Sequence, residues 1–173
     1  IFTGLKLDDS SIADFTYKIS AVVESENLFD TVKLSVELFP NVLDVYIVTD
    51  NTVNSHLFNN KIKMLTDQLK QRVNIINNES AESLKNFISK VPNNAILIFN
   101  RFNFDANTVP VNDSTMLKLL VSVARIPIFA VHKHDLIEGV LGGVVTSGFS
   151  QGEATANKVL QLLNGAPIDS FPV

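Results

Sequence analysis

Short, continuous apolar runs alternate with amphipathic stretches along most of this chain. A run that is apolar at successive positions predicts a strand buried on both faces, as in a parallel sheet covered by helices. The stretches between the runs carry apolar residues at helical spacing on one face, which predicts the covering helices. Repetition of strand, helix and strand predicts an α/β fold with a doubly wound parallel sheet. The predicted strands are residues 44–49, 73–76, 95–99, 127–131 and 140–145.

Helices are predicted before, between and after these strands. The first covers residues 28–39, with Asn27 as its N-cap and Pro40 ending it. The last covers residues 151–163, and Gly165 takes the C′ position beyond its end. The helices between them are predicted from three apolar faces: Phe58, Ile62, Leu65 and Leu69; Leu84, Phe87, Ile88 and Val91; and Leu117, Leu120, Val121 and Ala124.

The composition is that of one globular domain with a sizeable core. The 173 residues are 46% hydrophobic, and 14 Lys and Arg against 18 Asp and Glu give a net charge of −4. Without a general basic field, the chain is not expected to bind nucleic acid. No apolar run approaches the roughly 20 residues of a membrane helix, and the lack of cysteine excludes disulfides and thiolate chemistry. Because the chain begins at Ile1 without Met or a signal peptide, we interpret it as a piece of a longer protein.

The first 26 residues follow a different pattern from the rest of the chain. They contain two short apolar pieces, residues 1–2 and 19–23, separated by a polar stretch. We expect these pieces to form edge strands of a sheet other than the main one.

Two polar loops follow the predicted strands 44–49 and 95–99. In open α/β sheets a ligand binds outside the carboxyl ends of the strands, where the strand order reverses. The loops therefore indicate a site for a small polar solute, in which Phe102 stacks on the ligand. The alternative is that these residues only form turns and helix N-caps, Ser55 above all. The polar candidates in the two loops are Asn51, Thr52, Ser55, Asn100 and Arg101.

Nothing in the sequence predicts catalysis, a metal or a cofactor. His132 and His134 follow the strand 127–131 at a spacing that suits a metal, but no third ligand is evident beside Asp135. The chain has no Gly-x-Ser-x-Gly nucleophile elbow. The loop at 50–55 contains no glycine, which argues against a phosphate-binding loop for FMN. A response-regulator receiver is also a poor fit, because the strand 95–99 is followed by Asn-Arg rather than by an aspartate.

The end of the chain carries the most specific pattern. A glycine-rich stretch at 139–146 (GVLGGVVT) precedes SGFSQG at 147–152, a helix at 154–163 (ATANKVLQLL) and PIDSFPV at 167–173. In this order the segments resemble the end of the ABC-transporter substrate-binding proteins of the type I periplasmic-binding-protein-like family. The family pattern there is a glycine-rich strand, a helix, and then Leu-x-Gly-x-x-Pro and Pro-Val.

The rest of the chain resembles the same family in order. Residues 1–4 (IFTG) are similar to its strand ending in a small turn, and residues 21–24 (AVVE) to its Gly-Val-x-Glu segment, with Ala21 at the glycine. Residues 28–40 resemble the helix that ends in Leu-x-Pro, and residues 46–52 resemble Val-Val-Asp-Asn-Thr. The whole chain is most similar to the versions used as extracytoplasmic sensor domains of bacterial histidine kinases and diguanylate cyclases.

This resemblance implies two lobes with a ligand cleft between them. Residues 1–27 are then a remnant of lobe one and a crossover, residues 28–139 are lobe two, and residues 140–173 return to lobe one. Most of lobe one is missing, either because the chain is a piece of a longer protein or because this protein has a reduced version of the lobe. Its absence leaves apolar terminal faces uncovered, so we expect a homodimer.

The resemblance also implies a function. We expect a non-enzymatic sensor domain of a membrane-anchored signalling protein, outside the cytoplasm, that binds a small solute and transmits lobe closure. The first alternative is the solute-binding component of an ABC transporter, and the second is a small flavodoxin-like enzyme or FMN-binding protein. Val131–Leu136 (VHKHDL) departs from the family pattern, which usually has a bulky aromatic beside the acidic residue. The implied cleft positions are Glu24, Asn51, Ser55, Asn100, Phe102, His132 and Asp135, beside Arg101 from the loop argument.

Overall fold

The chain divides into two compact units. The computed structural model describes residues 1–5, 20–23, 27–50, 62, 66, 69–77 and 79–171. One unit comprises residues 27–145, here called the sheet unit. The other, here called the terminal unit, comprises residues 1–26 together with 146–173. The assignment of these units to two lobes of a larger protein stays a prediction.

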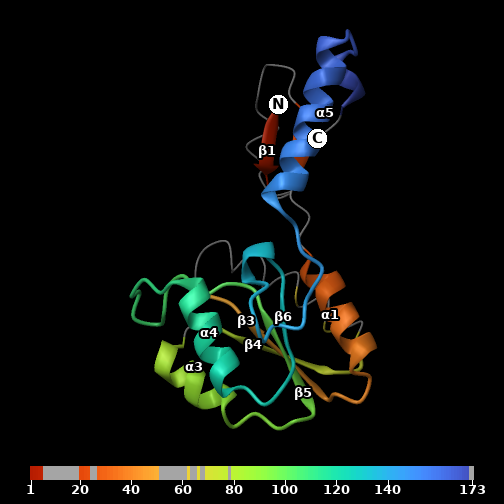
Figure 1. Cartoon of the computed structure of the whole chain (residues 1–173). Helices are drawn as coiled ribbons and strands as arrows, with labels where there is room; N and C mark the ends of the chain where they lie inside the picture. Colours follow the sequence, from red (N-terminus) through yellow and green to blue (C-terminus); the bar gives the residue numbers. More distant parts are fainter. Residues whose placement is uncertain are drawn as a thin grey trace. The chain divides into compact units, whose positions relative to one another are not determined.

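The sheet unit is built on a parallel sheet in the order β4-β3-β5-β6 (Figure 1). The parallel sheet predicted from the runs at 44–49, 73–76, 95–99 and 127–131 is confirmed, and β4 lies at its edge beside β3. Asp44 and Arg72 pair across the first two strands through two hydrogen bonds of 2.9 and 2.8 Å, and the guanidinium lowers the pKa of the Asp44 carboxyl. The strands are β3 (Asp44–Val48), β4 (Arg72–Ile76), β5 (Ala95–Phe99) and β6 (Ile128–Ala130).

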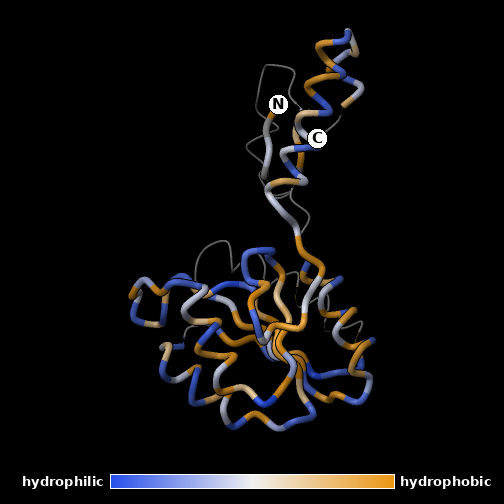
Figure 2. The backbone as a smooth tube through the Cα atoms, viewed as in Figure 1, coloured by the Kyte–Doolittle hydropathy of each residue, from blue (hydrophilic) through white to orange (hydrophobic). Residues whose placement is uncertain are grey.

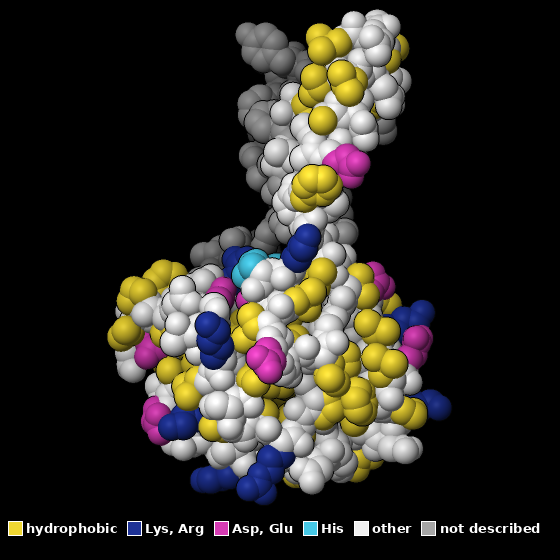
Figure 3. Space-filling view, in the orientation of Figure 1, with side chains coloured by type: hydrophobic (Ala, Val, Ile, Leu, Met, Phe, Trp, Pro, Cys, Tyr) yellow, Lys and Arg dark blue, Asp and Glu magenta, His cyan; other side chains and the backbone are white. Residues whose placement is uncertain are grey.

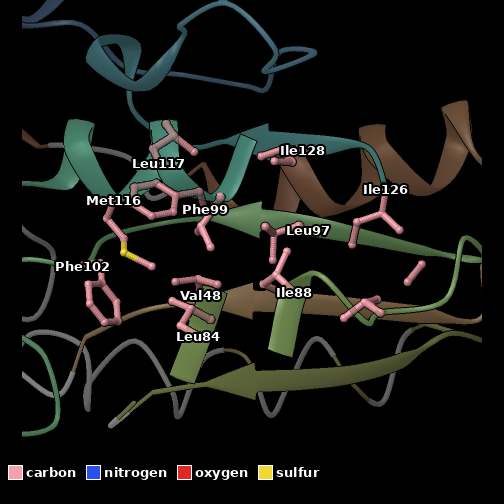
Figure 4. Close-up of a cluster of buried hydrophobic side chains, with 13 residues drawn as sticks. Val48, Leu84, Ile88, Leu97, Phe99, Phe102, Met116, Leu117, Ile126 and Ile128 are labelled. Atoms are coloured by element: carbon pink, nitrogen blue, oxygen red, sulfur yellow. The ribbon is translucent and has the colours of Figure 1, made fainter. Parts of the chain in front are cut away.

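Helices cover both faces of this sheet. Helices α3 (Ala81–Ile88) and α4 (Asp113–Val123) pack on one face, and α1 (Leu28–Leu38) packs on the other (Figure 1). All of β5 is buried, because its alternating side chains enter the two cores in turn. Hydrophobic colouring accordingly concentrates along the strands in Figure 2. Figure 4 shows the core on the α3–α4 side, which includes Leu97, Phe99 and Leu117.

Polar side chains begin two of these helices. Ser80 accepts a hydrogen bond from the Ser83 N–H at the start of α3, and Asn112 accepts one from the Thr115 N–H at the start of α4. Asn27 occupies the N-cap position of α1 as predicted, but its side chain makes no capping hydrogen bond there.

Two sequence predictions in the sheet unit are wrong. Residues 140–145 form no strand and contribute a single parallel bridge from Gly142 to Phe129. A Cβ on Gly143 would lie 1.9 Å from the Ala130 carbonyl oxygen, so this segment approaches β6 in a way only glycine permits. Phe87 was expected on the buried face of its helix, but it is 44% exposed. Its ring packs edge-on against the ring of Tyr46, with the two ring centroids 5.5 Å apart.

The terminal unit pairs β1 (Phe2–Leu5) with β2 (Ala21–Val23) in parallel, which confirms a second sheet from the two apolar pieces. Helix α5 (Gly148–Leu163) contacts both strands, and the Lys158 ammonium donates to the Ala21 carbonyl at 2.6 Å. The helix begins three residues earlier than expected, because the Ser147 hydroxyl accepts from the Ser150 N–H. Gly165 follows the helix with φ +94°, as the C′ prediction requires.

Candidate functional site

The carboxyl ends of β3, β5 and β6 lie at one edge of the sheet, here called the carboxyl edge. The strand order reverses between β3 and β5, since β4 lies beside β3 on one side and β6 lies beside β5 on the other. This is the position at which open α/β sheets bind their ligands.

Two buried polar residues follow β3 at this edge. The Thr49 N–H donates to the Ile76 carbonyl at 3.0 Å, while the Thr49 hydroxyl is buried without a hydrogen-bond partner among the described residues. Asp50 is 1% exposed, and one of its carboxylate oxygens accepts from the Asn103 N–H at 3.2 Å. The Asp50 carboxylate therefore ties the end of β3 to the segment that follows β5.

The segment after β5 turns the chain toward α4. The Asn100 N–H donates to the Val48 carbonyl at 3.0 Å, and the residue is nearly buried. The Phe102 N–H donates to the Asp113 carboxylate in the first turn of α4. The Phe102 ring is 1% exposed within the core on the α3–α4 side, a position that differs from the stacking role expected from the sequence.

The segment after β6 contains a buried acid beside two histidines. A short 3₁₀ turn, η2 (Lys133–Asp135), places Asp135 fully out of solvent. Neither Asp135 carboxylate oxygen has a hydrogen-bond partner among the described residues, and the His134 Nε2 lies 3.6 Å from one of them. That separation is too long for a hydrogen bond. The rings of His132 and His134 stack in parallel with their centroids 5.4 Å apart.

Burial raises the pKa of two carboxyls at this edge. The pKa of Asp113 is raised by burial, against the opposing effects of the hydrogen bond from Phe102 and the charge of Arg101. The pKa of Asp135 is raised to about 6, mainly by burial, while His134 acts to lower it. The carboxyl edge therefore holds two acids that would be easier to ionise if a cation approached them.

The structure brings some of the predicted site residues together, and others lie outside the residues that it describes. Asn100 and Arg101 follow β5, and His132 and Asp135 follow β6, at the same edge of the sheet. Glu24, Asn51, Thr52 and Ser55 lie outside the described residues, so their placement stays a prediction.

Sequence reasoning missed three polar residues at this edge: Thr49, Asp50 and Asp113. Thr49 has a sequence signal, since it is a hydroxyl at the end of an otherwise apolar run. At Asp113 the sequence indicates only an acidic residue in the first turn of a helix, where a negative charge is favourable. Its contact with the segment after β5 comes from the tertiary fold.

A shallow groove of about 470 Å³ lies at the opposite, amino edge of the sheet. It is mostly apolar, and amide side chains supply its polar groups. The groove is separate from the carboxyl edge, since its residues precede β3 and β5 rather than follow them. Its lining residues are Leu38, Phe39, Pro40, Asn41, Val42, Asn93 and Asn94.

The described residues contain neither a metal-binding cluster nor a membrane-spanning helix. No group of three or more His, Cys, Asp or Glu side chains in that part of the chain is arranged to hold a metal ion. Of the helices there, none is both long and apolar enough to cross a membrane.

The sequence pattern of the family described as ABC transporter substrate binding protein matches residues 11–173. The chain therefore belongs to this family, and its parallel sheet flanked by helices is the fold of such proteins. Families of this kind bind solutes and are not enzymes. No curated protein shows significant sequence similarity to the chain.

Solved structures share the fold at low sequence identity. A ligand-free, open substrate-binding protein with adhesive properties from Clostridium difficile has a TM-score of 0.72 and 17% identity over 99% of this chain. A conserved domain protein from Vibrio cholerae (15% identity) and an ABC domain in complex with L-Trp from Streptococcus pneumonia (21%) each have a TM-score of 0.59 over 89% of this chain. The chain spans 59%, 51% and 52% of these three proteins, respectively.

Proposed function

We propose that this chain is part of the solute-binding component of an ABC transporter, and that the carboxyl edge is its share of the binding site. The observation that carries the proposal is the Asp135 carboxylate, which is fully buried without a hydrogen bond from any described residue. A buried charge without a donor is costly, and such groups are found mainly where function requires them. A solute that supplies the missing donor stabilises the carboxylate.

The chemistry of the edge favours a small solute that carries a cationic nitrogen. Asp135 accepts such a group, while Asn100, Arg101 and His132 offer donors for the polar or anionic end of the same molecule. Free amino acids have both features. The structure from Streptococcus that shares this fold is a complex with L-Trp, which belongs to this class of ligand.

The two units fit a protein of two lobes that close on a solute. In this proposal residues 27–145 belong to one lobe, residues 1–26 and 146–173 belong to the other, and solute shifts the population from open to closed. The setting is extracytoplasmic, as for other members of the family. The transport role replaces the membrane-sensor role expected from the sequence, because family and neighbours both favour substrate binding and no observation favours a sensor.

Calorimetry with a panel of the common amino acids tests the proposal. Because the chain supplies only part of a cleft, we expect weak binding that variants of the carboxyl edge weaken further. Asn100→Ala should lower affinity about tenfold, and Asp135→Asn more than that, since it removes the charge. Lys118→Ala, on the exposed side of α4, is the control and should change nothing. Unchanged affinity in both edge variants would mean that the solute binds elsewhere.

We also propose that this chain by itself pairs with a second copy through α5. The helix has no buried residue, and Phe149, Leu160 and Leu163 are 78%, 56% and 78% exposed. Figure 3 shows hydrophobic side chains gathered on α5. Exposed apolar faces of this kind tend to associate. Light scattering at high micromolar concentration should detect a dimer that Leu160→Glu dissociates, and a monomer there would contradict the pairing.

A further inference from the structure

Asp135 and His134 form a pair in which the acid is inaccessible and the base is exposed. The Asp135 carboxylate has no exposed surface, whereas 69% of the His134 side chain is exposed. The imidazole lies 3.6 Å from one carboxylate oxygen, within reach of an ion pair but too far for a hydrogen bond. Of the described groups near the carboxylate, His134 is therefore the one that an incoming solute can displace.

Other charges from three elements act on the same carboxylate. Asp113 from α4 repels it, and Arg101 from the segment after β5 attracts it. Asp50, after β3, acts in turn on Asp113. Burial outweighs the attractive contributions and raises the pKa of Asp135 to about 6, close to the range in which histidines titrate. The titratable and charged groups facing the pair among the described residues are thus Asp50, Arg101, Asp113 and His132, with Lys133 exposed on the same turn.

We propose that Asp135 and His134 share one proton when no solute is bound, and that a cationic solute takes the place of His134 beside the carboxylate and drives this proton into solvent. The inference rests on the proposed function, since it assumes that a cationic solute reaches Asp135.

The protons and charges balance in each state. Without solute, the proton resides on a carboxyl oxygen or on the imidazole, and either arrangement leaves the pair neutral overall. With solute, the carboxylate is ionised and paired with the solute's cation, and the shared proton passes to a buffer base. Solute binding is therefore linked to pH: below about pH 6, each unit of acidification should weaken it up to tenfold.

Carbon-detected NMR titration of the 173-residue chain tests the pair without any solute. The Asp135 carboxyl should titrate near pH 6 in the wild type and in the control Lys133→Gln, which removes a neighbouring charge that does not act on Asp135. In His134→Gln the midpoint should rise, because the cation that favours the ionised form is gone. A wild-type midpoint near 4, or the same midpoint with and without His134, would overturn the proposal.

A second titration tests the displacement with small cations. Methylammonium should lower the Asp135 midpoint, whereas tetramethylammonium at the same concentration should not, because it has no N–H to donate to the carboxylate. An Asp135 midpoint that methylammonium leaves unmoved overturns the displacement.

The two proposals fail in distinguishable ways. Amino acids that bind without releasing a proton, measured by calorimetry at pH 6 in buffers of different ionisation enthalpy, would overturn this inference and leave solute binding intact. A methylammonium-sensitive pair in a chain that binds no amino acid would support the shared proton and contradict the proposed ligand class.

Discussion

The two units of this molecule are both built from parallel strands and helices, but they bury these elements to very different extents. In the sheet unit, every residue of β5 is buried between helices on both faces, whereas in the terminal unit the sixteen residues of α5 include none that is buried. Among the described residues of the terminal unit, α5 contacts two short strands, β1 and β2, and these leave its apolar side chains exposed. The contrast teaches that the sheet unit has a core sufficient for stability, while the terminal unit needs further surface to cover its apolar face.

The largest expected difference between the units comes from one substitution made in two helices. Leu117→Ala in α4 empties a fully buried position and should lower the free energy of unfolding by about 2–5 kcal/mol. Leu163→Ala in α5 changes a side chain that is 78% exposed and should cost less than about 0.5 kcal/mol. Urea denaturation of both variants measures the difference. Equal losses would mean that α5 is as well packed as α4.

The next effect concerns the buried acid of the sheet unit. The folded-state pKa of Asp135 lies above its ordinary value of 3.8, so between about pH 4 and pH 6 the folded chain binds its proton more tightly than the unfolded chain does. The stability from this residue is therefore fully present below about pH 4 and is lost as the pH rises from there through 6. Asp135→Asn removes the dependence and should stabilise the chain at pH 7 by on the order of 3 kcal/mol, with little effect at pH 4.

Urea denaturation at the two pH values checks this expectation. A variant that is less stable than the wild type at pH 7 would contradict it, and would indicate that the carboxylate makes a stabilising contact.

Alanine in place of glycine should change the stability of the two units by smaller amounts and in opposite directions. Gly143→Ala places a Cβ against the Ala130 carbonyl oxygen and should destabilise the sheet unit by about 2 kcal/mol. Gly152→Ala in α5 meets nothing within 4 Å and should stabilise the helix by up to about 1 kcal/mol. Thermal unfolding of the two variants checks both signs, and a stabilising Gly143→Ala would show that the segment can move away from β6.

The smallest expected effects come from the helix caps. Ser80 and Ser147 each accept one backbone N–H at the start of α3 and α5, and alanine at either position should cost about 1 kcal/mol. In the sheet unit the loss should appear as global destabilisation. In the terminal unit it should appear as faster amide exchange confined to the first turn of α5. Exchange measurements that show the same behaviour for both variants would remove the distinction between the units.

The sequence predicted the sheet better than the site. The four strands were recognisable because continuous apolar runs are rare outside doubly buried strands. Asn100 and His132 were chosen as site candidates because they follow such runs, and Asp135 because the family resemblance implies it. The failure at residues 140–145 has the opposite cause, since two glycines interrupt a run whose composition is that of a strand. The burial of Asp135 and its contact with His134 depend on how η2 turns, which no local pattern specifies.

The most direct test of the account is a map of where solute touches the sheet unit. Chemical-shift perturbation by NMR suits it, because weak binding still moves the resonances of contacted residues. Titration of the 173-residue chain with the panel of amino acids should perturb the backbone signals of Thr49, Asn100 and Asp135 at the carboxyl edge. Perturbations confined to Phe39, Asn93 and Asn94 in the groove at the amino edge, or none at all, would contradict the account.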